Sequence, residues 1–171
     1  MTLDERVKRR IAVWSGPRNI STAMMRAWEN RADTVVCDEP LYAHYLKETG
    51  LPHPGAAEVM AAQETDWRKV TAGLTGEIPF GKRFYYQKHM AHHLLPVIDR
   101  DWITKLTNVI LIRDPNAVLS SLVKVLPEAT VFDTGFPQLL ELFAWLGDSS
   151  GTEPVVVDAG DILVDPKRHL Q

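Results

Sequence analysis

The chain reads IAVWSGPRNIST over residues 11–22, and this stretch decides the fold. Its first four residues are apolar and stop at Ser-Gly-Pro, which predicts a buried strand over residues 11–14 that enters a turn. Beyond the turn, apolar residues recur every three to four positions, at Ile20, Ala23, Met24, Ala27 and Trp28. This spacing predicts a helix with one apolar face. The stretch is therefore expected to form a strand, a loop and a helix in direct succession.

The same alternation continues along the chain. Apolar or aromatic runs predict further strands at residues 34–37, 83–88, 107–112 and 154–157. Helices are expected between them, at residues 41–46, 56–74, 89–98, 116–125 and 138–146. Strands that alternate with helices predict an α/β fold of three layers with a central parallel sheet.

No repeat or linker divides the chain, so we expect one domain over residues 1–171. A last helix is expected to open at Asp165–Pro166, close to the final residue. The sequence leaves open whether the domain is truncated at its C-terminus.

Composition limits the class of partner. Hydrophobic residues make up 45% and charged residues 24%, which is ordinary for a protein with one buried core. A formal charge of -3 argues against nucleic acid or an anionic membrane as a partner of the whole surface, so any anion site must be local. Cys37 is the only cysteine, which excludes an intrachain disulfide and favours a cytoplasmic setting. No run approaches the roughly 18 apolar residues that a membrane span needs.

The loop after the first strand has the chemistry of a phosphate site. A strand that turns through glycine into a helix leaves backbone N–H groups unpaired where an anion can bind. Gly16 allows close approach, Arg18 adds charge, and Ser21 and Thr22 supply hydroxyl groups. The nucleoside-triphosphatase signature has a second glycine and a lysine where this chain has Ile20 and Ser21, so a Mg²⁺–triphosphate site is not expected. The alternative interpretation is an ordinary turn with Ser21 as a helix cap.

A second arginine-bearing turn follows the strand at residues 107–112. Arg113, Asp114 and Pro115 end that strand, and Ser121 stands eight residues after the arginine. Together with the first loop, this arrangement resembles the sulfotransferase family, which combines a Pro-Arg/Lys loop ending in two hydroxyl residues with an Arg-Asn/Asp-Pro turn and a later serine. Gly16, Pro17, Arg18, Ser21 and Thr22 match the first motif, and Arg113, Asp114, Pro115 and Ser121 match the second.

The resemblance implies that the chain binds 3′-phosphoadenosine 5′-phosphosulfate (PAPS) and releases 3′-phosphoadenosine 5′-phosphate, with no metal required. The 5′-phosphosulfate would lie on the first motif, to which we assign Ser15, Gly16, Pro17, Arg18, Asn19, Ser21 and Thr22. The 3′-phosphate would lie on Arg113 and Ser121. The family usually has Ser-Gly where this chain has Asn19-Ile20. Because a β-branched residue disfavours a positive φ, we expect the loop to close with a different backbone geometry.

Sulfuryl transfer to an alcohol or amine needs a base for the acceptor proton and positive charge beside the leaving oxygen. The resemblance gives Arg18 the second role. Two candidates for the base stay open. One is Glu39, after the second strand; the other is a histidine next to Lys88, for which His89, His92 and His93 cannot be separated, although His89 is expected to follow the strand end directly.

Further residues are assigned to the acceptor side. Asp38, Tyr42, His44 and Tyr45 are expected to line the acceptor pocket, and residues 127–137 to act as a lid. A metal held by the histidines is not expected, because only His89 and His93 have helical i, i+4 spacing and no third ligand is evident.

Three functions remain at this point. The first is an enzyme that moves a sulfuryl group from PAPS to a small hydroxyl or amine acceptor. The second is a 3′-phosphonucleotide-binding module without turnover, and the third is a P-loop phosphotransferase. The identity of the acceptor and the oligomeric state are left open by the sequence.

Overall fold

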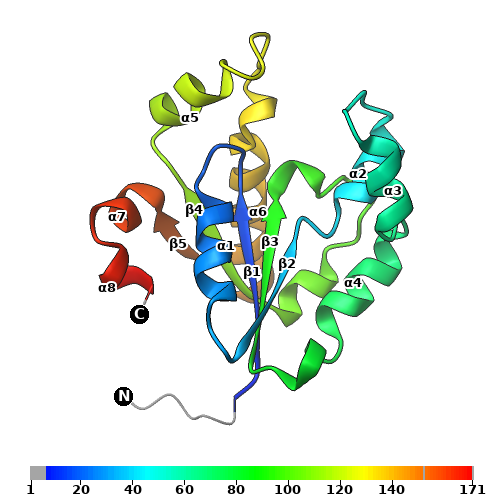
Figure 1. Cartoon of the computed structure of the whole chain (residues 1–171), viewed down its shortest axis with the longest axis vertical. Helices are drawn as coiled ribbons and strands as arrows, with labels where there is room; N and C mark the ends of the chain where they lie inside the picture. Colours follow the sequence, from blue (N-terminus) through cyan, green and yellow to red (C-terminus); the bar gives the residue numbers. More distant parts are fainter. Residues whose placement is uncertain (1–6, 152, 171) are drawn as a thin grey trace.

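The computed structural model describes residues 7–151 and 153–170 (Figure 1). Its strands are β1 (Arg9–Ser15), β2 (Thr34–Asp38), β3 (Phe84–Met90), β4 (Thr107–Ile112) and β5 (Val155–Asp158). The α-helices are α1 (Ser21–Glu29), α2 (Tyr42–Thr49), α3 (Ala56–Ala62), α4 (Trp67–Thr75), α5 (Pro115–Leu122), α6 (Phe136–Ser150), α7 (Ala159–Val164) and α8 (Pro166–Leu170). Short 3₁₀ helices are η1 (Pro79–Gly81), η2 (Ala91–His93), η3 (Asp101–Lys105) and η4 (Phe132–Thr134).

The five strands form one parallel sheet in the order β2-β3-β1-β4-β5. All strand arrows in Figure 1 point to the same upper edge, where the chain leaves β1 for α1 and β4 for α5. The amino ends of the strands meet at the lower edge. Because loops at the carboxyl ends of parallel strands form the binding crevice of such sheets, the upper edge is the place to look for a site.

Each face of the sheet carries its own apolar cluster. On one face, Ala12 and Trp14 of β1 pack with leucines of α4 and α6. On the other, Val13 packs with methionines of α1 and with Ile162 of α7. Neighbouring residues of β1 thus point to opposite faces, and both faces are covered. The predicted three-layer α/β fold with a central parallel sheet is confirmed.

Three predicted elements differ clearly from the structure. The helix expected over residues 56–74 is two helices, because Gln63 is extended and Asp66 caps α4 by accepting a hydrogen bond from the Arg68 N–H. The third strand was expected to end at Lys88, but β3 continues to Met90, which pairs with Ser15. The helix expected over residues 89–98 is accordingly reduced to η2.

Candidate functional site

The loop between β1 and α1 is held by a backbone contact with the segment before α6. A Cβ atom on Gly16 would lie 2.1 Å from the carbonyl oxygen of Thr134, and one on Gly135 would lie 2.8 Å from the Gly16 Cα. Gly16 is therefore required for space. Sequence spacing does not relate Gly16 to this partner, and the one local signal is the residue type at Gly135, a glycine that has a φ of 74°.

Two residues of this loop adopt the left-handed backbone conformation. Arg18 has a φ of 61° and Ile20 a φ of 51°. The expectation that Ile20 would avoid a positive φ is wrong. Its side chain packs against the cluster beneath α1, and this packing offsets a backbone cost of about 1–2 kcal/mol. The loop therefore closes with a left-handed residue immediately before α1, where the family usually has glycine.

The backbone N–H groups at the start of α1 receive no side-chain cap. Ile20 occupies the N-cap position and supplies no side-chain hydrogen bond. The first turn of a helix has N–H groups without partners inside the helix, and these attract an anion. Ser21 and Thr22 begin this turn. The alternative interpretation, in which Ser21 caps the helix, is wrong because Ser21 is the first helical residue.

The second arginine-bearing turn lies directly against the first loop. Arg113 donates a hydrogen bond from Nη1 to the carbonyl oxygen of Arg18 at 2.8 Å, and the Arg18 Nε donates to the Ser121 hydroxyl at 2.7 Å. The two motifs, about a hundred residues apart in the sequence, are thus joined by two hydrogen bonds. Both arginines lie at the same edge of the sheet.

These residues surround a cleft of about 300 Å³, lined by Arg18, Asn19, Ile20, Ser21, Thr22, Arg113 and Ser121. Of the residues assigned to the donor, Ser15, Gly16 and Pro17 do not line it. The buried Ser15 hydroxyl faces the Met90 sulfur, and the Asn19 amide donates to the carbonyl oxygen of Leu111 at 2.7 Å. Ser15, Gly16 and Asn19 therefore shape the loop, whereas the arginines and hydroxyl groups face the cleft.

A buried lysine organises the carboxylates after β2. The Lys88 side chain is 3% exposed, and its Nζ donates to Oδ1 of Asp38 at 2.7 Å and to Oε1 of Glu39. Glu39 is 27% exposed and has a φ of 47°. One ammonium group thus fixes two carboxylates, of which Glu39 is held in a strained backbone conformation. The role of Asp38 as a second partner of Lys88 was not predicted.

His89 lies inside β3 and not after it, which corrects the predicted position. Its ring stacks on Trp14 at 4.2 Å and lies 5.8 Å from the ring of Trp102. Complete burial, with a smaller contribution from the nearby Lys88 charge, lowers the pKa of His89 to about 3. The prediction failed because the polar residues Gln87, Lys88 and His89 look like the end of a strand, whereas β3 is buried along its whole length and continues to Met90.

His92 and His93 form an aromatic group with Tyr42 and Tyr45 beside Glu39. The His93 ring stacks on Tyr42 at 4.9 Å, and His92 meets Tyr45 edge to face. The Nδ1 atom of His93 lies 4.0 Å from Oε2 of Glu39. Burial lowers the pKa of both histidines, so both are neutral at physiological pH. The contact between His93 and Glu39 joins positions 54 residues apart and could not be predicted.

His44, which was expected to join this group, points elsewhere. Its Nδ1 lies 2.9 Å from the carbonyl oxygen of Thr65, and its ring lines a separate cavity with Lys47 and Arg68. The prediction failed because His44 lies on a different face of α2 from Tyr42 and Tyr45. Of the predicted acceptor-side residues, Asp38, Tyr42 and Tyr45 are gathered near Glu39.

The segment of residues 127–137 reaches both parts of the site. Its 3₁₀ helix η4 ends at Thr134, which contacts Gly16 of the first loop. The charge of Asp133 raises the pKa of Tyr45 in addition to the larger effect of burial, which places Asp133 near the aromatic group. The C-terminal end of this segment therefore contacts the loop between β1 and α1.

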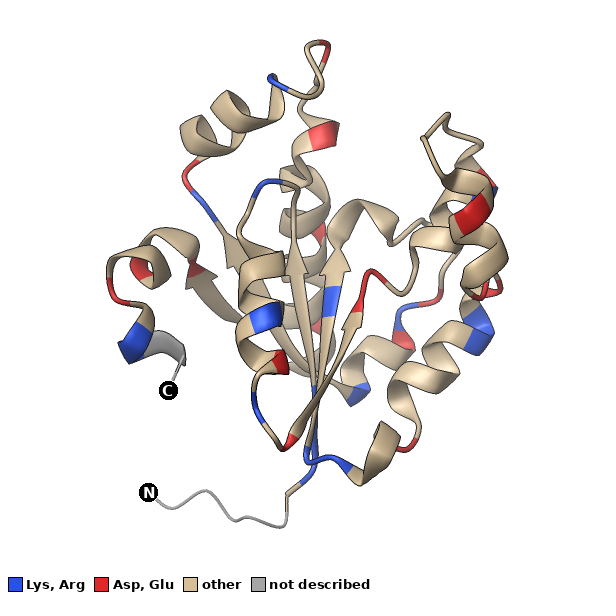
Figure 2. Cartoon of the chain, in the orientation of Figure 1, with Lys and Arg blue, Asp and Glu red and all other residues tan. Residues whose placement is uncertain are grey.

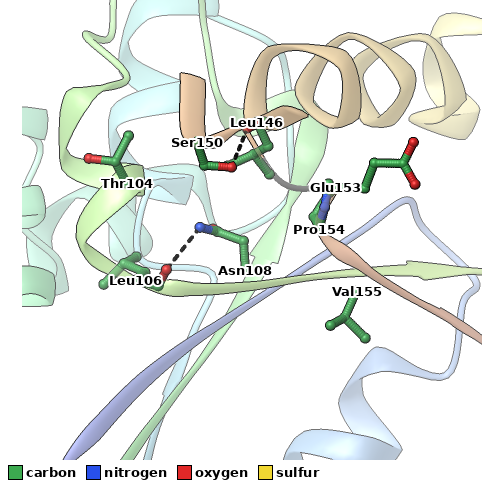
Figure 3. A pocket seen from close by; sticks show the side chains of 8 residues that line it. All are labelled: Thr104, Leu106, Asn108, Leu146, Ser150, Glu153, Pro154 and Val155. Atoms are coloured by element: carbon green, nitrogen blue, oxygen red, sulfur yellow. Dashed lines mark hydrogen bonds between the residues drawn. The ribbon is translucent and has the colours of Figure 1, made fainter. Parts of the chain in front are cut away.

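Another cavity, of about 210 Å³, lies at the opposite edge of the sheet (Figure 3). It is bounded by the amino ends of β4 and β5, and its lining includes Asn108, Ser150 and Glu153. The Asn108 side chain is occupied by hydrogen bonds to Trp14 and to two backbone carbonyl oxygens. Among the described residues that line this cavity there is no arginine or lysine, so nothing in this lining favours a phosphate group.

The described residues contain neither a metal-binding cluster nor a membrane-spanning helix. In residues 7–151 and 153–170, no group of three His, Cys, Asp or Glu side chains is arranged to hold a metal ion. Within that same part of the chain, no helix is long and apolar enough to cross a membrane.

Residues 9–171 match the family described as Sulfotransferase domain. Branched-chain-amino-acid aminotransferase-like protein 1 of Arabidopsis thaliana is 34% identical over 161 residues, which are 92% of this chain and 28% of the relative. The like-named protein 2 of the same plant is 32% identical and also covered over 28% of its length. The chain thus spans little more than a quarter of these curated relatives.

Two solved structures resemble the fold. The sulfotransferase from Alicyclobacillus acidocaldarius superposes with a TM-score of 0.56 at 12% identity, over 96% of this chain and 78% of that one. The sulfotransferase domain of the Synechococcus PCC 7002 olefin synthase gives a TM-score of 0.51 at 16% identity, over 98% of this chain and 74% of that one. At these identities the likeness concerns the fold alone.

Proposed function

The chain belongs to the sulfotransferase domain family, and from this premise we propose that it transfers a sulfuryl group from PAPS to the hydroxyl or amine of a small acceptor. One observation carries the proposal. The predicted 5′-phosphosulfate loop and the predicted 3′-phosphate turn share one cleft and are joined through Arg18, Arg113 and Ser121. A donor with phosphate groups at both ends requires two such anion sites side by side.

The donor fits the residues of the cleft. The uncapped N–H groups of α1 and the hydroxyl groups of Ser21 and Thr22 would hold the 5′-phosphosulfate. The Arg113 guanidinium and the Ser121 hydroxyl would hold the 3′-phosphate. The volume of about 300 Å³ is at the lower end of the range for small-molecule sites, so part of the adenosine would stay on the surface.

In the proposed reaction, the acceptor oxygen or nitrogen forms a bond to sulfur, and the bond from sulfur to the bridging phosphate oxygen breaks. The electron pair of the broken bond stays with that oxygen, and 3′-phosphoadenosine 5′-phosphate leaves. Arg18 stabilises the negative charge that develops there. The acceptor proton goes to a base of the protein, so the step is balanced without a metal.

We assign the base to Glu39. Its carboxylate is partly exposed, whereas His89 is enclosed between two tryptophans and has a pKa of about 3. His92 and His93 are weakened as bases by burial, which lowers the pKa of each. Lys88 holds one carboxylate oxygen of Glu39, and the other faces the Nδ1 of His93. This second oxygen is the one available to an acceptor.

The proposal is tested first by binding. Titration calorimetry is expected to detect 3′-phosphoadenosine 5′-phosphate without Mg²⁺, because the site supplies its positive charge from arginines and backbone N–H groups. Binding of ATP only, and only with Mg²⁺, would instead favour a phosphotransferase and contradict the proposal.

Turnover tests the base. With labelled PAPS and a panel of hydroxyl and amine acceptors, Glu39→Gln is expected to lower kcat by about 10²–10⁴-fold and to leave nucleotide affinity unchanged. Glu77→Gln is the matched control, because it makes the same change at an exposed residue after α4 that is not part of the site, and its kcat is expected to stay within about threefold of the parent. An unchanged kcat in Glu39→Gln would exclude Glu39, and nucleotide binding without turnover in the parent chain would reduce the function to a binding module.

A further inference from the structure

The turn before β3 presents an aromatic side chain to water. Phe80 lies in η1, is 88% exposed, and has a φ of 57°. A left-handed backbone costs about 1–2 kcal/mol for a residue with a Cβ, and here no packing of the ring offsets it. Pro79 and Gly81 flank it and fix the turn. A ring held outward at such a cost indicates a partner that receives it.

Basic residues surround this turn. Lys82 and Arg83 follow it, and Arg9, at the start of β1, donates its N–H to the carbonyl oxygen of Arg83. Lys8 precedes Arg9 and is exposed. We call the set Lys8, Arg9, Arg10, Arg31, Phe80, Lys82 and Arg83 the basic edge. Figure 2 shows several of the lysines and arginines at the lower ends of β1 and β3, opposite the upper edge of the sheet.

Two cations of this edge donate hydrogen bonds to uncharged carbonyl oxygens. The Arg10 guanidinium donates to the carbonyl oxygen of Gly76, and the Lys82 Nζ donates to that of Ala32 at 2.6 Å. Carbonyl oxygens carry no formal charge, so both cations keep theirs. Arg31 is different, because it pairs with Asp33. The total charge of -3 therefore hides a local excess of positive charge.

We propose that the basic edge docks on an anionic lipid surface, with the ring of Phe80 inserted among the headgroups. A single aromatic ring, that of Phe80, projects from the turn. A bilayer interface deforms around such a ring, whereas a protein partner must supply a preformed pocket for it. One inserted aromatic and a few cations are each weak membrane signals, but they add when they lie together. In this orientation the cleft, at the other edge of the sheet, faces the solution and stays open to nucleotide.

Vesicle sedimentation tests the proposal with the protein as it stands. The chain is expected to sediment with phosphatidylcholine vesicles that contain phosphatidylserine, not with pure phosphatidylcholine, and less as salt is raised. Phe80→Ala is expected to lower the partition coefficient about tenfold. The pair Lys8→Ala and Arg9→Ala is expected to lower it about thirtyfold, since each basic residue near the surface adds about one factor of five.

Matched variants lie away from the basic edge. Phe132→Ala removes another exposed phenylalanine, and the pair Lys47→Ala and Lys124→Ala removes the same charge from α2 and from the chain after α5. Both should sediment like the parent, and thermal denaturation checks that each variant is folded. Equal loss in the matched variants would overturn the proposal. So would a chain that ignores both kinds of vesicle but binds polyglutamate through Phe80, because the partner would then be an acidic protein.

Discussion

The turn from β1 into α1 and the turn from β4 into α5 line the same cleft, but they treat their helix N-termini differently. At α1 the N-cap residue is Ile20, which has left-handed backbone and gives no side-chain hydrogen bond. At α5 the N-cap is Asp114, whose Oδ1 accepts from the Ala117 N–H at 2.9 Å, and Pro115 occupies the next position. The first helix start is open to a ligand, and the second is satisfied within the protein.

The two turns are therefore expected to bind phosphate through different groups. The first turn offers backbone N–H groups, whose positions depend on the loop conformation and on the contact of Gly16 with Thr134. The second turn offers the side chains of Arg113 and Ser121. Binding at the first turn should therefore depend on backbone shape, and binding at the second on single side chains.

The largest effect is expected from a substitution that displaces the backbone of the first turn. In Gly16→Ala, the new Cβ would collide with the Thr134 carbonyl group, so one of two backbones must shift. We expect a loss of about 2–3 kcal/mol in the free energy of unfolding, measured with urea, and loss of detectable nucleotide binding by calorimetry. Gly73→Ala is the control, because the added Cβ would meet nothing within 4 Å beyond its chain neighbours and the backbone of α4 itself, and it should stabilise the protein by up to about 1 kcal/mol. Normal nucleotide affinity in Gly16→Ala would show that the first turn does not form the anion site.

The next test removes one side chain from the second turn. Arg113→Ala is expected to weaken 3′-phosphoadenosine 5′-phosphate about a hundredfold and adenosine 5′-phosphate by much less, because only the first ligand has a 3′-phosphate. Calorimetry with both ligands gives the two losses. Arg113 also donates to the Arg18 carbonyl oxygen. Equal losses for the two ligands would mean that Arg113 acts only by holding the first loop.

The parallel sheet and the residues of the two arginine-bearing turns can be predicted from local sequence patterns. The strands are apolar runs between turn residues, and their alternation with helices sets the parallel sheet. The arginines and hydroxyl residues of both turns were predicted because each motif lies within one short stretch of sequence that follows a strand. The fold places both at one edge, as the topology of parallel strands requires.

The rest depends on contacts between distant parts of the chain. The backbone of Ile20 contradicts a local steric preference, because packing beneath α1 offsets the cost. The predicted position of His89 was wrong because a strand that is covered on both faces shows no alternation of apolar and polar residues from which its end could be predicted. The contact of His93 with Glu39 and that of Gly16 with Thr134 join residues that no sequence spacing relates.

The smallest effect is expected when the side-chain cap of the second turn is removed. Asp114→Ala removes the cap of α5 and should lower the free energy of unfolding by about 1 kcal/mol. Asp66→Ala, which removes the corresponding cap of α4 far from the cleft, should cost a similar amount. If the second turn binds phosphate through side chains alone, the affinity for 3′-phosphoadenosine 5′-phosphate should stay within about threefold in both variants. A gain of tenfold in Asp114→Ala alone would instead show that the N–H groups it frees at α5 donate hydrogen bonds to phosphate, and both turns would then bind phosphate through backbone N–H groups.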